Sequence, residues 1–159
     1  MVSLIAETHA RFPPLKASNL EKQALDLPGG FEGRVNLLLV AFERSQQRDV
    51  DTWLKELPGI QRSHAGFAYY ELPVISRLNP IARWFIDNGM RGGIPDKAQR
   101  TRTITLYIDK APFKNALAIP GEDRIYAVLV TKNGDVVWRA DGVYTDEKGK
   151  SLEQFLAAR

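Results

Sequence analysis

Cysteine is absent from the 159 residues of this chain. Disulfides, thiolate-bound metals and every reaction that needs a thiolate nucleophile are therefore excluded. A chain without cysteine persists in oxidising and in reducing compartments alike, so this absence does not identify the compartment. The chemistry of the protein must come from other side chains.

Long apolar runs and metal-binding patterns are also missing. No apolar run approaches the roughly 18 residues that span a bilayer. The first residues lack the basic start and apolar stretch of a signal peptide, so we expect a cytoplasmic protein. The two histidines, His9 and His64, are too far apart in the sequence for ligand spacing, and no glycine-rich nucleotide loop is present. We expect no metal and no cofactor.

The composition is that of a globular domain of ordinary size. Hydrophobic residues make up 44% and charged residues 26%, with a net charge of +3. The prolines at 13 and 14 favour an extended backbone, so residues 1–17 are predicted to be an extended lead-in. Residues 18–159 are predicted to form a single domain.

The sequence predicts a sheet with helices on both faces, which is an α/β fold. The run Val35–Phe42 is nearly all apolar, which is typical of a central strand covered on both sides. A short hairpin is predicted between Asn19 and Phe31, with its turn at Pro28–Gly30. Asn133-Gly134 favours a tight turn between the last two strands. The predicted sheet strands cover residues 35–42, 67–75, 103–109, 124–131 and 135–140.

Four segments favour helices. An apolar stripe from Val50 to Leu57 predicts a helix that ends at Pro58-Gly59. Asn79-Pro80 predicts the capped start of a second helix, and residues 111–118 predict a short third one. Thr145 or Asp146 can cap the last helix, whose start we expect to be late or irregular because of Gly149.

Two stretches carry a family resemblance. Residues 19–27 followed by 31–35 resemble the opening hairpin and the entry into the first core strand of the thioredoxin superfamily, closest to its peroxiredoxin-like, or redoxin, branch. Residues 129–137 are similar to the last hairpin of that family. Residues 128–142 weakly resemble the thioredoxin-like assembly factors of the mitochondrial ATP synthase, although Trp138 here precedes Arg139. The resemblance implies a central mixed β-sheet flanked by helices, with an N-terminal β-hairpin.

The resemblance also implies where a site would lie. Redox members place their cysteine where the helix after the first core strand begins, and Ser45 stands at that place, within a position or two. A helix dipole alone cannot activate a serine hydroxyl, so Ser45 is interpreted as a helix cap, with contact to a partner or ligand as the alternative. Arg124 and Tyr126 lie near the places of the family's peroxide-binding arginine and cis-proline. Arg124 is more simply an exposed or paired charge. The candidate site comprises Arg44, Ser45, Gln46, Gln47, Arg48, Arg124 and Tyr126.

Three hypotheses of function follow. The first is a non-redox interaction or assembly-type protein, in which the amides of Gln46 and Gln47 and the nearby arginines bind an acidic segment of a protein partner. The second is an enzyme with a non-thiol small-molecule site in the same groove. The third is binding of nucleic acid or an anionic surface through residues 77–102, which hold six positive and two negative side chains. The simpler interpretation of that segment is a solvated face with Trp84 and Phe85 in the core.

Overall fold

A five-stranded mixed sheet lies at the centre of the computed structural model, which describes residues 10–77 and 80–159 apart from the side chains of Pro80 and Phe85. The strand order is β5-β4-β3-β6-β7. Strands β3, β4 and β5 are parallel, β6 is antiparallel to β3, and β7 is antiparallel to β6. The strands are β3 (Val35–Ala41), β4 (Phe67–Ile75), β5 (Leu106–Tyr107), β6 (Tyr126–Thr131) and β7 (Val136–Asp141).

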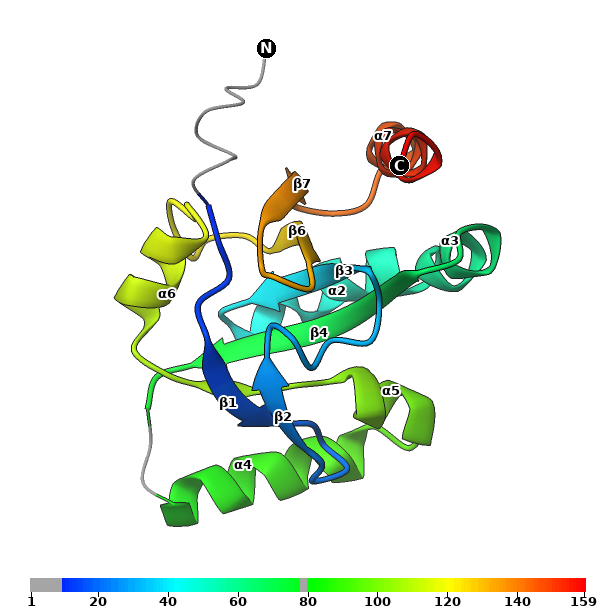
Figure 1. Cartoon of the computed structure of the whole chain (residues 1–159). Coiled ribbons are helices and arrows are strands. Elements are labelled where there is room, and N and C mark those ends of the chain that lie inside the picture. The colour runs from blue at the N-terminus through cyan, green and yellow to red at the C-terminus, as the bar shows by residue number, and fades with distance from the viewer. Residues whose placement is uncertain (1–9, 78–79) are drawn as a thin grey trace.

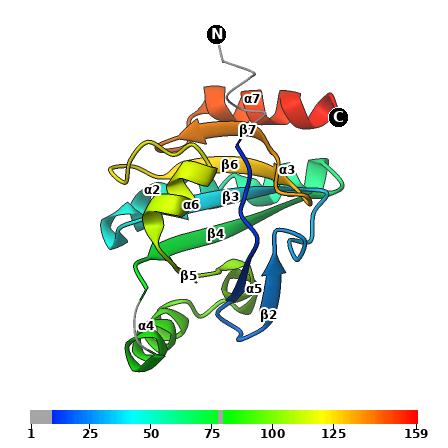
Figure 2. The same ribbon diagram turned by 60° about the vertical axis from the view of Figure 1, so that its left-hand side comes forward.

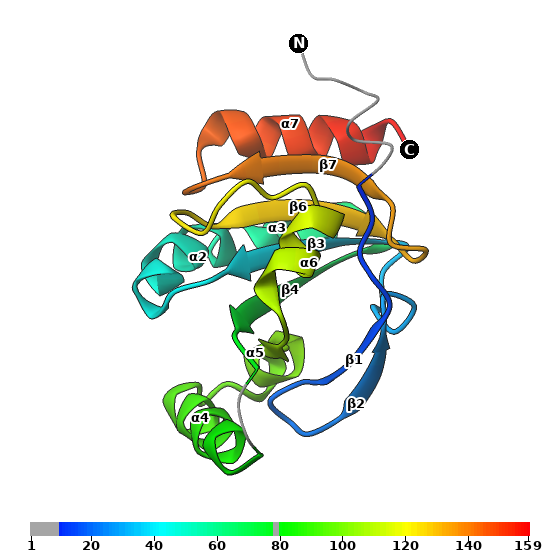
Figure 3. The same ribbon diagram turned by 90° about the vertical axis from the view of Figure 1, so that its left-hand side faces the viewer.

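Both faces of the sheet are covered, as the apolar run of β3 predicts. One face packs against residues of the N-terminal segment, such as Phe12, and against Phe113 of helix α6 (Lys110–Ala116). The other packs against Trp53, Leu57 and Leu152. Figures 2 and 3 show α6 in front of the sheet, with α2 and α3 behind it. The helices of this second face are α2 (Gln47–Leu54), α3 (Leu57–Ser63) and α7 (Asp146–Ala157).

The N-terminal hairpin is present, but it lies earlier in the chain than the predicted range of Asn19 to Phe31. Strands β1 (Leu15–Ser18) and β2 (Ala24–Leu27) pair antiparallel, so the turn covers residues 19–23. Asn19 organises this turn, because its Oδ1 accepts hydrogen bonds from the backbone N–H groups of Glu21 and Gln23. Pro28–Gly30 follows the second strand instead of joining the two. The division of the chain after residue 17 remains a prediction.

Helix boundaries also differ from those predicted. Helix α2 ends at Leu54 and Pro58 lies in the first turn of α3, where a missing N–H costs no hydrogen bond. A helix that was not predicted, α5 (Lys97–Arg102), begins after Asp96, whose side chain accepts a hydrogen bond from the N–H of Ala98. The predicted strand 103–109 is accordingly short, reduced to β5 and isolated bridges at Thr103 and Ile104.

The last helix is regular from its first residue. Thr145 caps it, as predicted, and Asp146 starts it. The expected irregular start is wrong because Gly149 is part of the packing: a Cβ there would overlap the hydroxyl of Tyr144. The tight turn at Asn133-Gly134 is confirmed, with Gly134 at φ +94°. The predicted cap at Asn79 and residue His9 lie outside the described residues.

Helix α4 (Pro80–Gly93) lies at the margin of the molecule (Figure 1), beyond β5 (Figure 2). The expectation that Trp84 belongs to the core is wrong, because its side chain is 56% exposed. The side chain of Phe85, which was also predicted to be buried, lies outside the part of the chain that the structure describes. No helix in the described part of the chain is long and apolar enough to cross a membrane.

Candidate functional site

The structure brings the two parts of the predicted site together at one end of the sheet. Strand β3 leads into the short 3-10 helix η1 (Arg44–Gln46), and α2 continues from it. Tyr126, at the start of β6, pairs with Val40 near the end of β3. The side-chain Nε2 of Gln46 donates to the carbonyl of Glu122 over 2.8 Å, which joins η1 to the loop before β6.

Gln46 is a structural residue of this site. Its side chain is 6% exposed, and its Oε1 accepts from the N–H groups of Phe42 (2.8 Å) and Glu43 (3.2 Å). Its Nε2 donates to the carbonyl of Glu122, so this buried amide is engaged within the protein and offers little surface to a partner. The proposed role of Gln46 in peptide recognition is therefore wrong, and the residue instead fixes the geometry of the exposed side chains around it.

Ser45 is exposed and is not the helix cap. The cap is Glu43, whose carboxylate accepts from the N–H of Gln46 while the Gln46 side chain accepts from the N–H of Glu43. This reciprocal pair is a capping box in which Glu43 takes the usual place of serine or threonine. The Glu43-x-x-Gln46 spacing is visible in the sequence.

The cations of the site fall into two groups. Arg124 contacts Asp123 and Asp141, each at 3.5 Å, and these carboxylates raise its pKa. In contrast, Arg44 and Arg48 are exposed and form no ion pair with the described residues. They are four positions apart at a helix start, so they lie on similar sides of it.

The loop beside these arginines is held by its own ion pairs. Glu122 lies 3.1 Å from Lys110 and 2.6 Å from Lys114, which anchors the loop to α6. The hydrogen bonds from Lys114 and Lys110 lower the pKa of Glu122. Tyr126 is 6% exposed, and burial raises its pKa, so its ring supports the sheet and offers little surface to a partner. The remaining predicted residue, Gln47, is exposed and turns its amide toward Asp51 and Glu71.

Glu71 is a residue that the sequence analysis missed. It lies in the middle of β4 and is 4% exposed. Gln99 (3.0 Å), Gln47 (3.3 Å) and Thr103 (3.4 Å) donate hydrogen bonds to its carboxylate. Burial raises the pKa of Glu71, against the opposing effect of these donors. The signal in the sequence is a single carboxylate inside an otherwise apolar strand.

The raised pKa of Glu71 predicts a pH-dependent stability. The folded protein retains a proton that the unfolded chain releases, so the free energy of unfolding falls as pH rises from near 4.5 toward the folded pKa. Glu71→Gln removes this titration. The free energy of unfolding of the variant should therefore fall less over that pH range than that of the wild type. Urea unfolding at a series of pH values measures the difference. Glu32→Gln, the same change at an exposed position, is the matched control, and identical slopes for the two variants would contradict the assignment.

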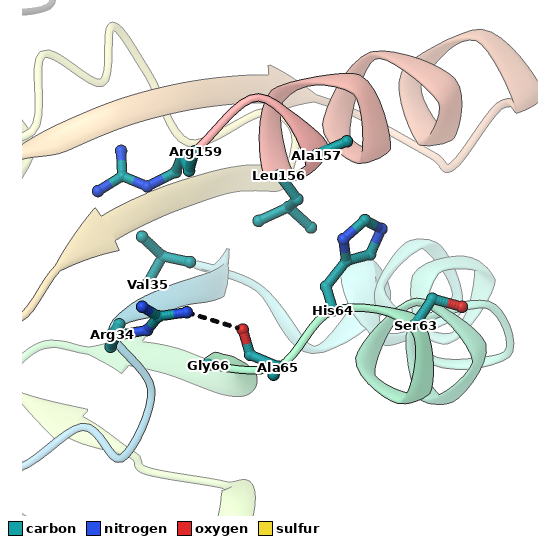
Figure 4. A pocket seen from close by; sticks show the side chains of 9 residues that line it. All are labelled: Arg34, Val35, Ser63, His64, Ala65, Gly66, Leu156, Ala157 and Arg159. Atoms are coloured by element: carbon teal, nitrogen blue, oxygen red, sulfur yellow. Dashed lines mark hydrogen bonds between the residues drawn. The ribbon is translucent and has the colours of Figure 1, made fainter.

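A surface pocket of about 600 Å³ lies at the opposite end of the sheet (Figure 4). Its walls include Arg34 before β3, His64 after α3 and Leu156 of α7. The guanidinium of Arg34 donates to the carbonyl of Ala65, which ties the two loops together. None of the predicted site residues lines this pocket. In the ranges 10–77 and 80–159, no group of three or more His, Cys, Asp or Glu side chains could hold a metal ion.

The comparisons with known proteins give structural neighbours only. No family model matches the chain, and no curated protein matches it. Among the solved structures, the thioredoxin domain of a thiol-disulfide oxidoreductase from Bacteroides vulgatus is similar, with a TM-score of 0.58, 19% identity, and coverage of 94% of this chain and 97% of that one. A thiol:disulfide interchange protein from a Bacteroides species is also similar, with a TM-score of 0.61 and 18% identity. The match covers 94% of this chain and 90% of that one.

A third neighbour, BsSco, is described as a member of the Sco family of cytochrome c oxidase assembly proteins. Its TM-score is 0.60 and its identity 12%, with 94% of this chain and 93% of that chain covered. Likeness at such low identity shows a shared architecture and leaves activity open. The mixed sheet, the helices on both faces and the N-terminal hairpin agree with these neighbours. The chain has a thioredoxin-like fold.

Proposed function

We propose that this chain is a non-redox interaction protein that binds an acidic segment of a protein partner at the start of α2. The observation that carries the proposal is the exposure of Arg44 and Arg48 without an ion pair among the described residues. Three neighbouring cations are already matched, Lys110 and Lys114 by Glu122 and Arg124 by Asp123 and Asp141. Two unmatched guanidinium groups on a rigid frame favour a carboxylate-bearing partner.

The frame supports the proposal because it needs no partner to hold it. The hydrogen bonds of Gln46 fix η1 to β3 and to the 122–126 loop. Preformed geometry lowers the entropy cost of ordering side chains on binding. An assembly-type role rests on the sequence resemblance, and the cytoplasmic location remains a prediction.

The test is affinity capture from extracts of the source cell, followed by titration of the captured protein. Arg44→Glu/Arg48→Glu should weaken binding by at least about tenfold, because like charges would face the acidic segment. Lys55→Glu/Arg62→Glu carries the same change in charge at exposed positions, one just after α2 and one on α3, and should bind like the wild type. Equal loss in both variants, or none in either, would reject the site.

The same proposal predicts no thiol redox activity. Reduction of disulfides and of peroxides by this family's chemistry needs a thiolate, and the chain contains no cysteine. Insulin reduction and peroxide consumption should both stay at the rate of the buffer blank. Turnover above that blank in a preparation free of contaminating reductases would be incompatible with a non-redox role.

A further inference from the structure

Helix α4 is held to the body of the protein by one of its faces. Arg83 lies over the ring of Tyr107, with 4.6 Å between the guanidinium carbon and the ring centroid. The hydroxyl of Tyr107 donates to Asp87 over 2.5 Å. Met90 continues this face, since its sulfur lies 3.5 Å from the hydroxyl of Thr105. The spacing 83, 87 and 90 is that of a single helix face, which leaves the opposite face turned away from the sheet.

The outward face of α4 carries the most exposed large apolar side chains of the described chain. Ile81 is 72% exposed and Trp84 is 56% exposed. Further along the helix, a Cβ added at Gly89 or Gly92 would meet no atom within 4 Å. In Figures 1, 2 and 3 the helix forms an outer margin of the molecule. Exposed apolar side chains gathered on one projecting helix mark an interaction surface more often than isolated ones do.

The charge around this face is positive. Residues 77–102 hold six cationic and two acidic side chains, a net charge of +4. Both acidic side chains are engaged within the protein: Asp87 accepts from Tyr107, and Asp96 accepts from the N–H of Ala98. Of the cations, Arg100 pairs with Glu21, and Arg77 lies 3.9 Å from Asp109 in an ion pair whose two side chains are largely exposed. Lys97 is exposed and forms no ion pair with the described residues. Two further carboxylates, Asp109 and Glu21, therefore reduce the local excess to two positive charges, which an occupant with negative charge beside an apolar layer would complement.

We propose that the outward face of α4, with Ile81 and Trp84 flanked by Arg77 and Lys97, binds the surface of an anionic lipid bilayer. The headgroup region of a bilayer accommodates an indole ring and a branched aliphatic side chain, while lipid phosphates pair with nearby cations. Each exposed cation adds to the attraction toward an anionic leaflet. Single-stranded RNA fits less well, because stacking sites use several aromatic side chains, and Ile81 cannot stack on a base.

A protein partner also fits less well. Ile81 and Trp84 project from the helix, and neither of the two pockets described for this structure is lined by α4. A lipid surface adapts to a projecting helix without a groove. Binding would be shallow, reaching on the order of 5–10 Å into the headgroup boundary, and reversible.

The test uses sedimentation of the full chain with vesicles of phosphatidylcholine, with and without about three parts in ten of phosphatidylglycerol. The chain should bind the anionic vesicles, bind neutral ones much more weakly, and dissociate as sodium chloride rises from about 0.05 M to about 0.5 M. Ile81→Ser/Trp84→Ser should weaken the partition constant by at least about tenfold. Val143→Ser, at an apolar side chain that is 43% exposed elsewhere, should change it less than about twofold.

A charge pair completes the design. Arg77→Glu/Lys97→Glu should also weaken binding, whereas Lys55→Glu/Lys150→Glu, with the same change in charge far from α4, should not. The Arg44 and Arg48 variants should bind vesicles like the wild type, so this inference and the proposed function fail separately. The proposal is overturned if vesicles are not bound, or if the α4 variants bind them normally. It is equally overturned if those variants lose binding to polyuridylate or polyglutamate while vesicles are not bound.

Discussion

Replacing Trp53 with alanine is expected to lower the free energy of unfolding by about 3–5 kcal/mol. The Trp53 side chain is 0% exposed and fills the space between α2 and the sheet. Its ring meets Tyr144 edge-on, with centroids 5.3 Å apart, and its indole N–H donates to the carbonyl of Gly142. The substitution removes the packing and leaves that carbonyl without its donor.

The matched control is the same substitution at Trp84. Because the Trp84 side chain is 56% exposed, its loss should cost less than about 1 kcal/mol. Urea unfolding followed by far-ultraviolet circular dichroism gives both values. A cost at Trp53 no greater than that at Trp84 would show that the two-layer packing around α2 is wrong.

Gln46→Ala is expected to have the second largest effect, about 2–4 kcal/mol, because it leaves two N–H groups and one carbonyl without partners. The groups are the N–H of Phe42, the N–H of Glu43 and the carbonyl of Glu122. Loss of the link to Glu122 also frees η1 from the neighbouring loop. Partner binding should therefore weaken even under conditions in which the variant is fully folded.

Ser45→Ala is the control for Gln46, since Ser45 is adjacent but exposed. It should change the free energy of unfolding by less than about 0.5 kcal/mol and leave partner binding intact. If Ser45→Ala destabilises the protein as much as Gln46→Ala does, then Ser45 is the cap after all. Thermal or urea unfolding of the two variants side by side decides between them.

The sheet was predictable from the sequence because its signals are local and strong. The apolar run of β3 and the Asn133-Gly134 turn each correspond to an element of the structure. The hairpin was expected too late in the chain because Pro28–Gly30 is a strong local turn signal. The observed turn is organised by the side-chain hydrogen bonds of Asn19, which the sequence does not reveal. Helix α5 was missed, although Asp96 is a usable capping signal.

The residues of the candidate site were expected to lie near one another, and the structure places them at one end of the sheet. The proximity of the helix start to Arg124 was implied by the thioredoxin-like resemblance, and the structure places β6 beside β3. The burial of Gln46 and Glu71 could not be predicted from the sequence, because it depends on partners far along the chain. These partners are Glu122 for Gln46 and Gln99 for Glu71. The exposure of Trp84 could not be predicted either, because an apolar stripe on a helix predicts a buried face wherever it occurs.

Amide hydrogen exchange of the chain, alone and with its captured partner, tests the interaction site most directly. The site at the start of α2 predicts slower exchange on binding in residues 43–48 and in the adjoining loop 122–126. The Arg44→Glu/Arg48→Glu variant should show no such slowing at the same partner concentration. Slowing confined to α4, or to the loops around Arg34 and His64, with residues 43–48 unchanged, would contradict the proposed function.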